Sequence, residues 1–153
     1  MTNAVDEKAK AIKLLITDVD GVLTEGRLVF NHQGLVCKEF HVHDGLGLQL
    51  LQKSGVKIAA ITTCVAELNR VRLEFLNFDD ILLGQKDKRG AYQQLLDKYH
   101  LADHEIAYMG DDLPDLPLIK RAGLGVITAN ATPLLQPYAD WQTTAGGGNG
   151  AVR

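Results

Sequence analysis

The sequence predicts a doubly wound α/β fold, in which helices cover both faces of a parallel sheet. Two patterns support this prediction. Short apolar runs of strand length alternate along the chain with segments of helical periodicity. The runs are apolar at almost every position, which is typical of strands that are buried on both faces. The length of 153 residues suits about one domain with one core, so we expect a single domain over 1–153 with no cap domain.

The elements follow in a regular order after a polar segment, 1–11, that we expect to be flexible. Strands are predicted at 12–16, 56–61, 80–83, 106–109 and 124–127, and helices at 46–53, 65–75, 88–99 and 114–122. A β-hairpin at about 26–41 interrupts the alternation after the first strand, because apolar runs at 27–30 and 35–40 flank a polar turn. Because the hairpin is apolar at most positions, it should rest on the domain body or on another subunit.

Composition excludes several classes of protein. Sixteen Lys and Arg residues against nineteen Asp and Glu residues give a net charge of −3, which argues against nucleic acid or an anionic membrane as a partner. No apolar run approaches the roughly 18–20 residues of a membrane span, and no signal peptide is visible. Cys37 and Cys64 have no metal-like spacing. We therefore expect a cytoplasmic protein.

Polar residues gather where the predicted strands end. In open α/β sheets the ligand site lies beyond the carboxyl ends of the strands. Carboxylates that crowd together there persist as anions when a cation joins them, and an all-oxygen ligand set suits Mg²⁺. With a Thr and a Lys nearby, such a site is arranged for a phosphoryl group. The residues concerned are Asp18, Asp20, Thr62, Lys88, Asp111, Asp112 and Asp115.

The first acidic pair, Asp18 and Asp20, indicates nucleophilic attack on phosphorus with acid–base assistance. A carboxylate can attack phosphorus and form an aspartyl-phosphate, and Asp18 at the strand end is the candidate nucleophile. Asp20 would protonate the leaving oxygen and then deprotonate the attacking water. Gly21 allows the tight turn that lets backbone N–H groups face a phosphate.

The order of these motifs resembles the haloacid-dehalogenase-like phosphatases: the run Asp18-Val19-Asp20-Gly21-Val22-Leu23-Thr24, then Thr62, Lys88 and Gly110-Asp111-Asp112. From Ile12 onward the layout is similar to the 3-deoxy-D-manno-octulosonate 8-phosphate phosphatase group, with the hairpin, residues 41–45, residues 110–115 and the closing segment 146–153. This resemblance implies a Mg²⁺-dependent phosphatase for a phosphorylated sugar acid in lipopolysaccharide biosynthesis. It also implies a homotetramer whose subunits complete one another's sites.

The resemblance further implies roles for single residues. Mg²⁺ would be held by Asp18, the backbone carbonyl of Asp20 and Asp111. Thr62 would donate to a phosphate oxygen, and Lys88 would neutralise the nucleophile and the developing charge. The residues expected to contact the substrate are Asp20, His41, Val42, His43, Asp44, Gly45, Gln49, Arg72 and Lys88.

This chain departs from that group at several positions. The octulosonate phosphatases usually carry Arg where this chain has His43, Gln49 and Cys64, and Gly where it has Thr63; Arg72 matches. Arg is the natural bidentate partner of a carboxylate. Another phosphorylated nonulosonate or sugar is therefore an alternative substrate.

Other interpretations stay open for individual residues and for the whole chain. Asp115 could cap the following helix or, like Asp112, support the metal site or Lys88. His41 and His43 alternate on a predicted strand face, which allows a metal site or substrate contact, and Cys64 suits packing. For the whole chain the rivals are a response-regulator receiver domain and a weakly catalytic oligomerisation module.

Overall fold

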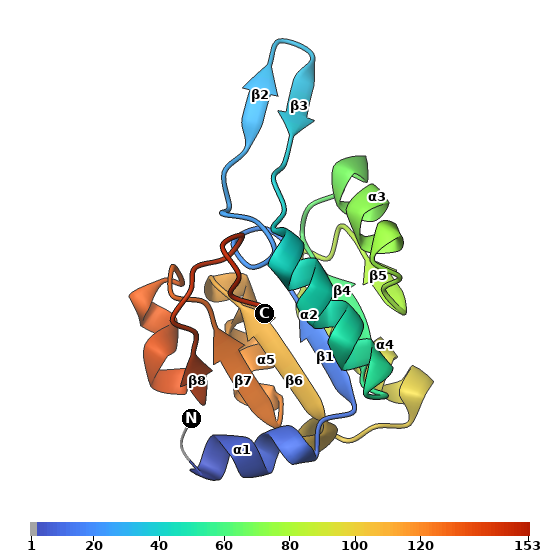
Figure 1. Ribbon diagram of the computed structural model, residues 1–153, viewed down its shortest axis with the longest axis vertical. Helices are drawn as coiled ribbons and strands as arrows, with labels where there is room; N and C mark the ends of the chain where they lie inside the picture. The colour runs from blue at the N-terminus through green and yellow to red at the C-terminus, as the bar shows by residue number, and fades with distance from the viewer. Residues whose placement is uncertain (1–2) are drawn as a thin grey trace.

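The computed structural model describes residues 3–153, and its centre is a six-stranded parallel sheet with the order β5-β4-β1-β6-β7-β8 (Figure 1). This architecture confirms the predicted fold class. The short strand β8 was not predicted, because two residues are too few to show a pattern. The strands are β1 (Leu14–Thr17), β4 (Lys57–Ile61), β5 (Asp80–Leu82), β6 (Ile106–Gly110), β7 (Leu124–Ile127) and β8 (Trp141–Gln142).

Helices pack on both faces of this sheet. The predicted helix at 114–122 is divided into a 3₁₀ turn, Leu113–Asp115, and a short helix, α5. Pro117 lies in the first turn of α5, where its missing N–H costs no hydrogen bond. The helices are α1 (Asn3–Lys10), α2 (Val42–Lys53), α3 (Glu67–Phe75), α4 (Lys88–Tyr99) and α5 (Leu116–Arg121).

The central strands are buried on both faces, as their apolar runs predict. In β1, Leu14 and Ile16 join the core under α4 and α5, whereas Leu15 packs toward α1 and α2. In β6, Tyr108 joins the α4 and α5 side, and Met109 the opposite side. Because side chains alternate across a strand, each run supplies two cores at once.

The expectation of a flexible N-terminal segment is wrong for the part that the structure describes. Residues 3–10 form α1, in which Val5 is buried against β6 and β7, and the Lys8 ammonium pairs with the Asp140 carboxylate. One buried valine among charged residues gives too weak a pattern to be read from the sequence. The same expectation for residues 1–2 lies outside the described residues.

The predicted hairpin is present and forms its own two-stranded sheet, β2 (Val29–Asn31) and β3 (Gly34–Cys37). It projects away from the domain (Figure 1), so the domain body does not support it. Its apolar side chains are exposed: Phe30 to 63% and Val29 to 52%. Support of the hairpin by another subunit therefore remains a prediction.

The sheet order determines where a site can form. From β1 the chain moves outward to β4 and β5, then returns to β6 on the other side of β1 and continues to β7 and β8. The direction of winding therefore reverses at β1, and ligands of such sheets bind beyond the strand ends at this point. Over residues 3–153, every helix is too short or too polar to cross a bilayer.

Candidate functional site

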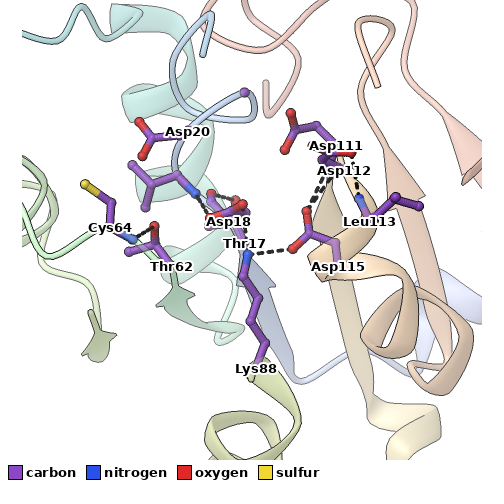
Figure 2. Close-up of polar contacts among 12 residues, drawn as sticks. Thr17, Asp18, Asp20, Thr62, Cys64, Lys88, Asp111, Asp112, Leu113 and Asp115 are labelled. Carbon is purple, nitrogen blue, oxygen red and sulfur yellow. Dashed lines mark hydrogen bonds and ion pairs between the residues drawn. The ribbon is translucent and has the colours of Figure 1, made fainter. Parts of the chain in front are cut away.

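Two acidic loops meet where the winding reverses. Asp18 follows β1 and Asp111 follows β6, and these strands are paired neighbours in parallel register, with Thr17 beside Met109. The two carboxylates therefore emerge from the same edge of the sheet, and Lys88 and Asp115 lie next to them (Figure 2). The structure thus brings these predicted site residues together.

The Asp18 carboxylate is held by two donors. One oxygen accepts from the backbone N–H of Val19 at 2.7 Å, and the other lies 2.8 Å from the Lys88 ammonium. Burial, with repulsion from Asp115, raises the pKa of Asp18 to about 6, although Lys88 opposes the rise. The metal-free site therefore disfavours a second negative charge beside Asp115.

Asp115 is the centre of the polar network, a role that the sequence left open. Its side chain is fully buried, and one oxygen accepts from the Lys88 ammonium and the Tyr108 hydroxyl, both at 2.6 Å. The other oxygen accepts from the backbone N–H groups of Asp111 at 3.0 Å and Asp112 at 3.3 Å. Asp115 thus positions the lysine and the loop that carries Asp111.

Lys88 opens helix α4 and is itself buried, with 2% of its surface exposed. Burial lowers the pKa of a lysine, but the carboxylates of Asp18 and Asp115 outweigh this effect and raise the pKa of Lys88. Burial and the same two carboxylates keep the pKa of Tyr108 well above its usual range. Lys88 is therefore a fixed cation and Tyr108 a neutral hydrogen-bond donor.

Three carboxylates could hold a metal ion: oxygens of Asp18, Asp111 and Asp115 all lie within 4.8 Å of one another. The Asp115 oxygens are already engaged by four donors, so Asp18 and Asp111 are the side chains available as ligands. Burial, followed by repulsion from Asp115, Asp18 and Asp112, raises the pKa of Asp111 to about 7. An all-oxygen donor set with excess negative charge fits a hard divalent cation.

Asp112 caps the turn that follows β6. Its side chain is exposed, and one oxygen accepts from the backbone N–H of Leu113 at 2.8 Å, which caps the 3₁₀ turn. The expected support of Lys88 comes from Asp115 instead, because Asp115 points inward from the other end of this turn.

The loop after β1 is held in place by neighbouring segments that pack closely against its backbone. Gly21 adopts φ +87°, and a Cβ there would lie 1.9 Å from an Asp111 oxygen, so the position requires glycine. Its carbonyl accepts from the Asn130 amide at 3.0 Å. A Cβ on Gly147 would lie 1.9 Å from the same carbonyl, so the glycine-rich C-terminal segment can pack directly on this loop.

Thr62 lies at the end of β4, where the sequence placed it, and is buried. Its hydroxyl oxygen accepts from the backbone N–H of Cys64 at 3.2 Å, which leaves the hydroxyl proton available to a ligand. In Figure 2, Thr62 lies on the opposite side of Asp18 from Asp115.

Asp20 has a partner that the sequence analysis missed. The Lys38 ammonium, from the base of the hairpin, lies 2.6 and 2.8 Å from the two Asp20 oxygens and 3.4 Å from the Cys64 sulfur. Interpreting Cys64 as a packing residue was therefore incomplete. Lys38 is 18 residues from Asp20 and 26 from Cys64, so no local pattern relates them.

The fold places the expected substrate contacts near the start of α2 in different environments. His41 and His43 do not alternate on a strand: His41 caps α2, and its ring accepts from the backbone N–H of His43. Val42 is 74% exposed. Asp44 is buried, and its carboxylate accepts from the backbone N–H groups of Gly150 and Arg153.

The remaining expected contacts line a separate hollow of about 180 Å³ between α2 and α3. There the Arg72 guanidinium lies over the rings of Phe40 and Phe75, at 5.6 and 5.7 Å. Gly45 and Gln49 complete the α2 side of this hollow.

The fold and the site together define a doubly wound α/β protein with an acidic centre whose ligands suit a divalent cation. Residues 51–152 match the model of the haloacid dehalogenase-like hydrolases. The 3-deoxy-D-manno-octulosonate 8-phosphate phosphatase KdsC of Escherichia coli K12 is 42% identical over 146 residues, which are 95% of this chain and 78% of the relative. The chain therefore belongs to the haloacid dehalogenase-like hydrolase family, as its motifs indicated.

Solved structures agree with this assignment. A subfamily III A hydrolase of this superfamily from Legionella pneumophila is 51% identical, with a TM-score of 0.96 over 98% of this chain and 82% of that one. The octulosonate 8-phosphate phosphatase of Moraxella catarrhalis, solved with magnesium, phosphate and KDO, is 41% identical, with a TM-score of 0.95 over 99% and 87%.

Proposed function

We propose that this protein is a Mg²⁺-dependent phosphatase that hydrolyses 3-deoxy-D-manno-octulosonate 8-phosphate. The observation that carries the proposal is the contact between Asp18, Lys88 and Asp115 beside Asp111, in a chain that matches such phosphatases over nearly its whole length. Membership of a hydrolase family favours turnover over the phosphoryl storage of a receiver domain.

The chain's own residues account for the two half-reactions. An Asp18 oxygen forms a bond to phosphorus while the bond from phosphorus to the sugar oxygen breaks, and a proton from Asp20 goes to that oxygen. Asp20 then takes a proton from the water that attacks the aspartyl-phosphate, which releases phosphate and restores Asp18. Lys88 balances the charge that develops on the phosphoryl oxygens, and the Thr62 hydroxyl donates to one of them.

The residues present fit a magnesium ion. Asp18 and Asp111 offer oxygen ligands, and burial together with the neighbouring carboxylates raises the pKa of both, an effect that a bound cation would oppose. The backbone carbonyl of Asp20 is the third ligand that we propose. When bound, Mg²⁺ would reduce the repulsion between the Asp18 carboxylate and the phosphate dianion.

The direct test is a phosphate-release assay with and without Mg²⁺ on octulosonate 8-phosphate and on a neutral phosphosugar of similar length. We expect Mg²⁺-dependent release with a higher kcat/KM for the sugar acid. Absence of release from every phosphate ester would overturn the proposed function.

A second substrate class is favoured by one observation: His43, Gln49 and Cys64 provide no guanidinium for the sugar carboxylate, and Arg72 packs between two aromatic rings. One lost charge-assisted contact costs roughly 1.5–3 kcal/mol, or on the order of ten- to a hundredfold in affinity. Equal kcat/KM values for both esters would indicate that the substrate is a neutral phosphosugar.

Metal binding should depend on pH through the two ligand carboxylates. The pKa values in the folded protein, about 6 for Asp18 and about 7 for Asp111, lie above the ordinary 3.8. As the pH rises, these two carboxyl groups therefore lose their protons at a lower pH in the unfolded chain than in the folded protein. The metal-free protein therefore loses stability from about pH 4 to about pH 7 through these groups. Mg²⁺ binds their ionised forms. We expect millimolar Mg²⁺ to raise the melting temperature by several degrees near pH 8 and hardly at all near pH 5.

Thermal unfolding followed by circular dichroism measures this difference, and Asp111→Asn serves as the control that should lose most of the Mg²⁺ effect. An equal Mg²⁺-induced rise at both pH values would show that other ligands hold the ion.

We also propose that the protein is a homotetramer held by the hairpin, whose exposed apolar residues are suited to burial against another subunit. Phe30→Asp should then give a monomer of about 16.7 kDa in light scattering, because a buried charge opposes association. Leu134→Asp, at a similarly exposed leucine on another part of the surface, should remain a tetramer. A wild-type monomer at micromolar concentration would refute the assembly.

A further inference from the structure

Lys38 is a buried cation in an otherwise exposed hairpin. Phe30 and Val36, on the two strands of the hairpin, are 63% and 48% exposed, yet the Lys38 side chain is 0% exposed. A lysine side chain is rarely buried without a specific partner, because removing an ammonium from water is costly. Its environment therefore indicates a role that the hairpin's apolar residues do not share.

The Lys38 ammonium has three hydrogens and three acceptors. Two are the Asp20 oxygens, at 2.6 and 2.8 Å, and the third is the Cys64 sulfur, at 3.4 Å. No donor is left over for a substrate. The geometry is therefore that of a group that holds another side chain in place.

The acceptors of Lys38 come from two different loops. Asp20 belongs to the loop after β1, and Cys64 to the turn after β4, where its sulfur also accepts from the backbone N–H of Ala66 at 3.4 Å. The Cys64 N–H in turn donates to the Thr62 hydroxyl oxygen. Lys38 thus bridges the loop of the proposed acid and base to the loop of the proposed phosphate ligand.

Asp20 needs such a restraint. Its side chain is 28% exposed, and its carboxylate makes its charged contact with Lys38. A freely rotating carboxylate would meet the leaving oxygen only part of the time, and a misplacement of about 1 Å can cost on the order of a hundredfold in rate.

We infer that Lys38 is a positioning residue that holds the Asp20 carboxylate for proton transfer and so connects the base of the hairpin to the chemistry. The inference rests on the proposed function, in which Asp20 protonates the leaving oxygen. It concerns a residue that contacts Asp20 and takes no part in bond making itself.

The test is the dependence on the leaving group. An alkoxide leaves poorly without a proton, whereas p-nitrophenolate leaves without one, so only the alkyl ester needs a positioned acid in the first half-reaction. Lys38→Met keeps the length of the side chain and removes the charge. We expect it to lower kcat/KM for a sugar phosphate by about ten- to a hundredfold and for p-nitrophenyl phosphate by less than about threefold.

Three further experiments distinguish a positioning role of Lys38 from a general loss of structure. Lys38→Arg should restore most of the activity, since a guanidinium also binds a carboxylate through two hydrogens. Lys53→Met, at an exposed lysine that ends α2, should leave both rates unchanged. A crystal structure of Lys38→Met should show the Asp20 carboxylate in a different rotamer, and this result does not depend on activity.

The outcomes are distinct. Equal losses with both esters, no loss with either, or an unmoved Asp20 would overturn the inference while the wild type remains an active phosphatase. A wild-type protein that hydrolyses neither ester would overturn the proposed function and the inference with it.

Discussion

Asp18→Asn should abolish turnover, with a loss on the order of 10⁴-fold or more, because an amide cannot act as the anionic nucleophile. Stability should not fall in parallel. In the metal-free protein the pKa of Asp18 is raised to about 6 by burial and by Asp115, so a neutral side chain relieves repulsion. We therefore expect the melting temperature without Mg²⁺ near pH 8 to stay the same or to rise.

The measurements are steady-state phosphate release and thermal unfolding of the same preparation. Mass spectrometry is needed to show that the new Asn has not deamidated to Asp. Asp97→Asn, at an exposed carboxylate on α4, is the matched control and should keep full activity. Appreciable release by a homogeneous Asp18→Asn preparation would rule out the covalent mechanism.

Asp115→Asn should damage both stability and activity. All four hydrogen-bonding neighbours of this carboxylate are donors. The NH₂ group of an asparagine would therefore point at other donors and find no acceptor. Removing the charge also leaves Lys88 buried with Asp18 as its remaining anion. We expect the free energy of unfolding to fall by about 3 kcal/mol and turnover by about a hundredfold, because Lys88 and the Asp111 loop lose their common anchor.

Urea denaturation and phosphate release measure the two effects. Asp112→Asn changes the neighbouring carboxylate in the same turn, but that side chain is exposed and caps a turn that Asn caps equally well. Its unfolding free energy should change by less than about 0.5 kcal/mol. Equal effects of the two substitutions would show that Asp115 is not the centre of the network.

The polar side chains of the site differ in how far they could be predicted. Asp18, Thr62, Lys88 and Asp111 each stand next to the end of a predicted strand or the start of a predicted helix, so topology alone places them at one edge of the sheet. The sequence pattern predicts Tyr108 only as a core residue of a buried strand. Its hydrogen bond to Asp115 is visible only in the structure and makes it part of the site. Asp44 reads as a loop carboxylate, and only the fold shows that it holds the C-terminal segment.

By itself the sequence determined the parallel sheet, most of its helices, the presence of the hairpin, and the acidic residues and lysine at the ends of the elements. These features depend on periodicity and on the ends of elements, which are local properties of the chain. Only the tertiary structure decided that Asp115 contacts Lys88, that Lys38 pairs with Asp20, and that the Arg72 guanidinium lies over the Phe40 ring. Each of these depends on which way a side chain points and on partners 18 or more residues away, which packing determines and no local pattern records.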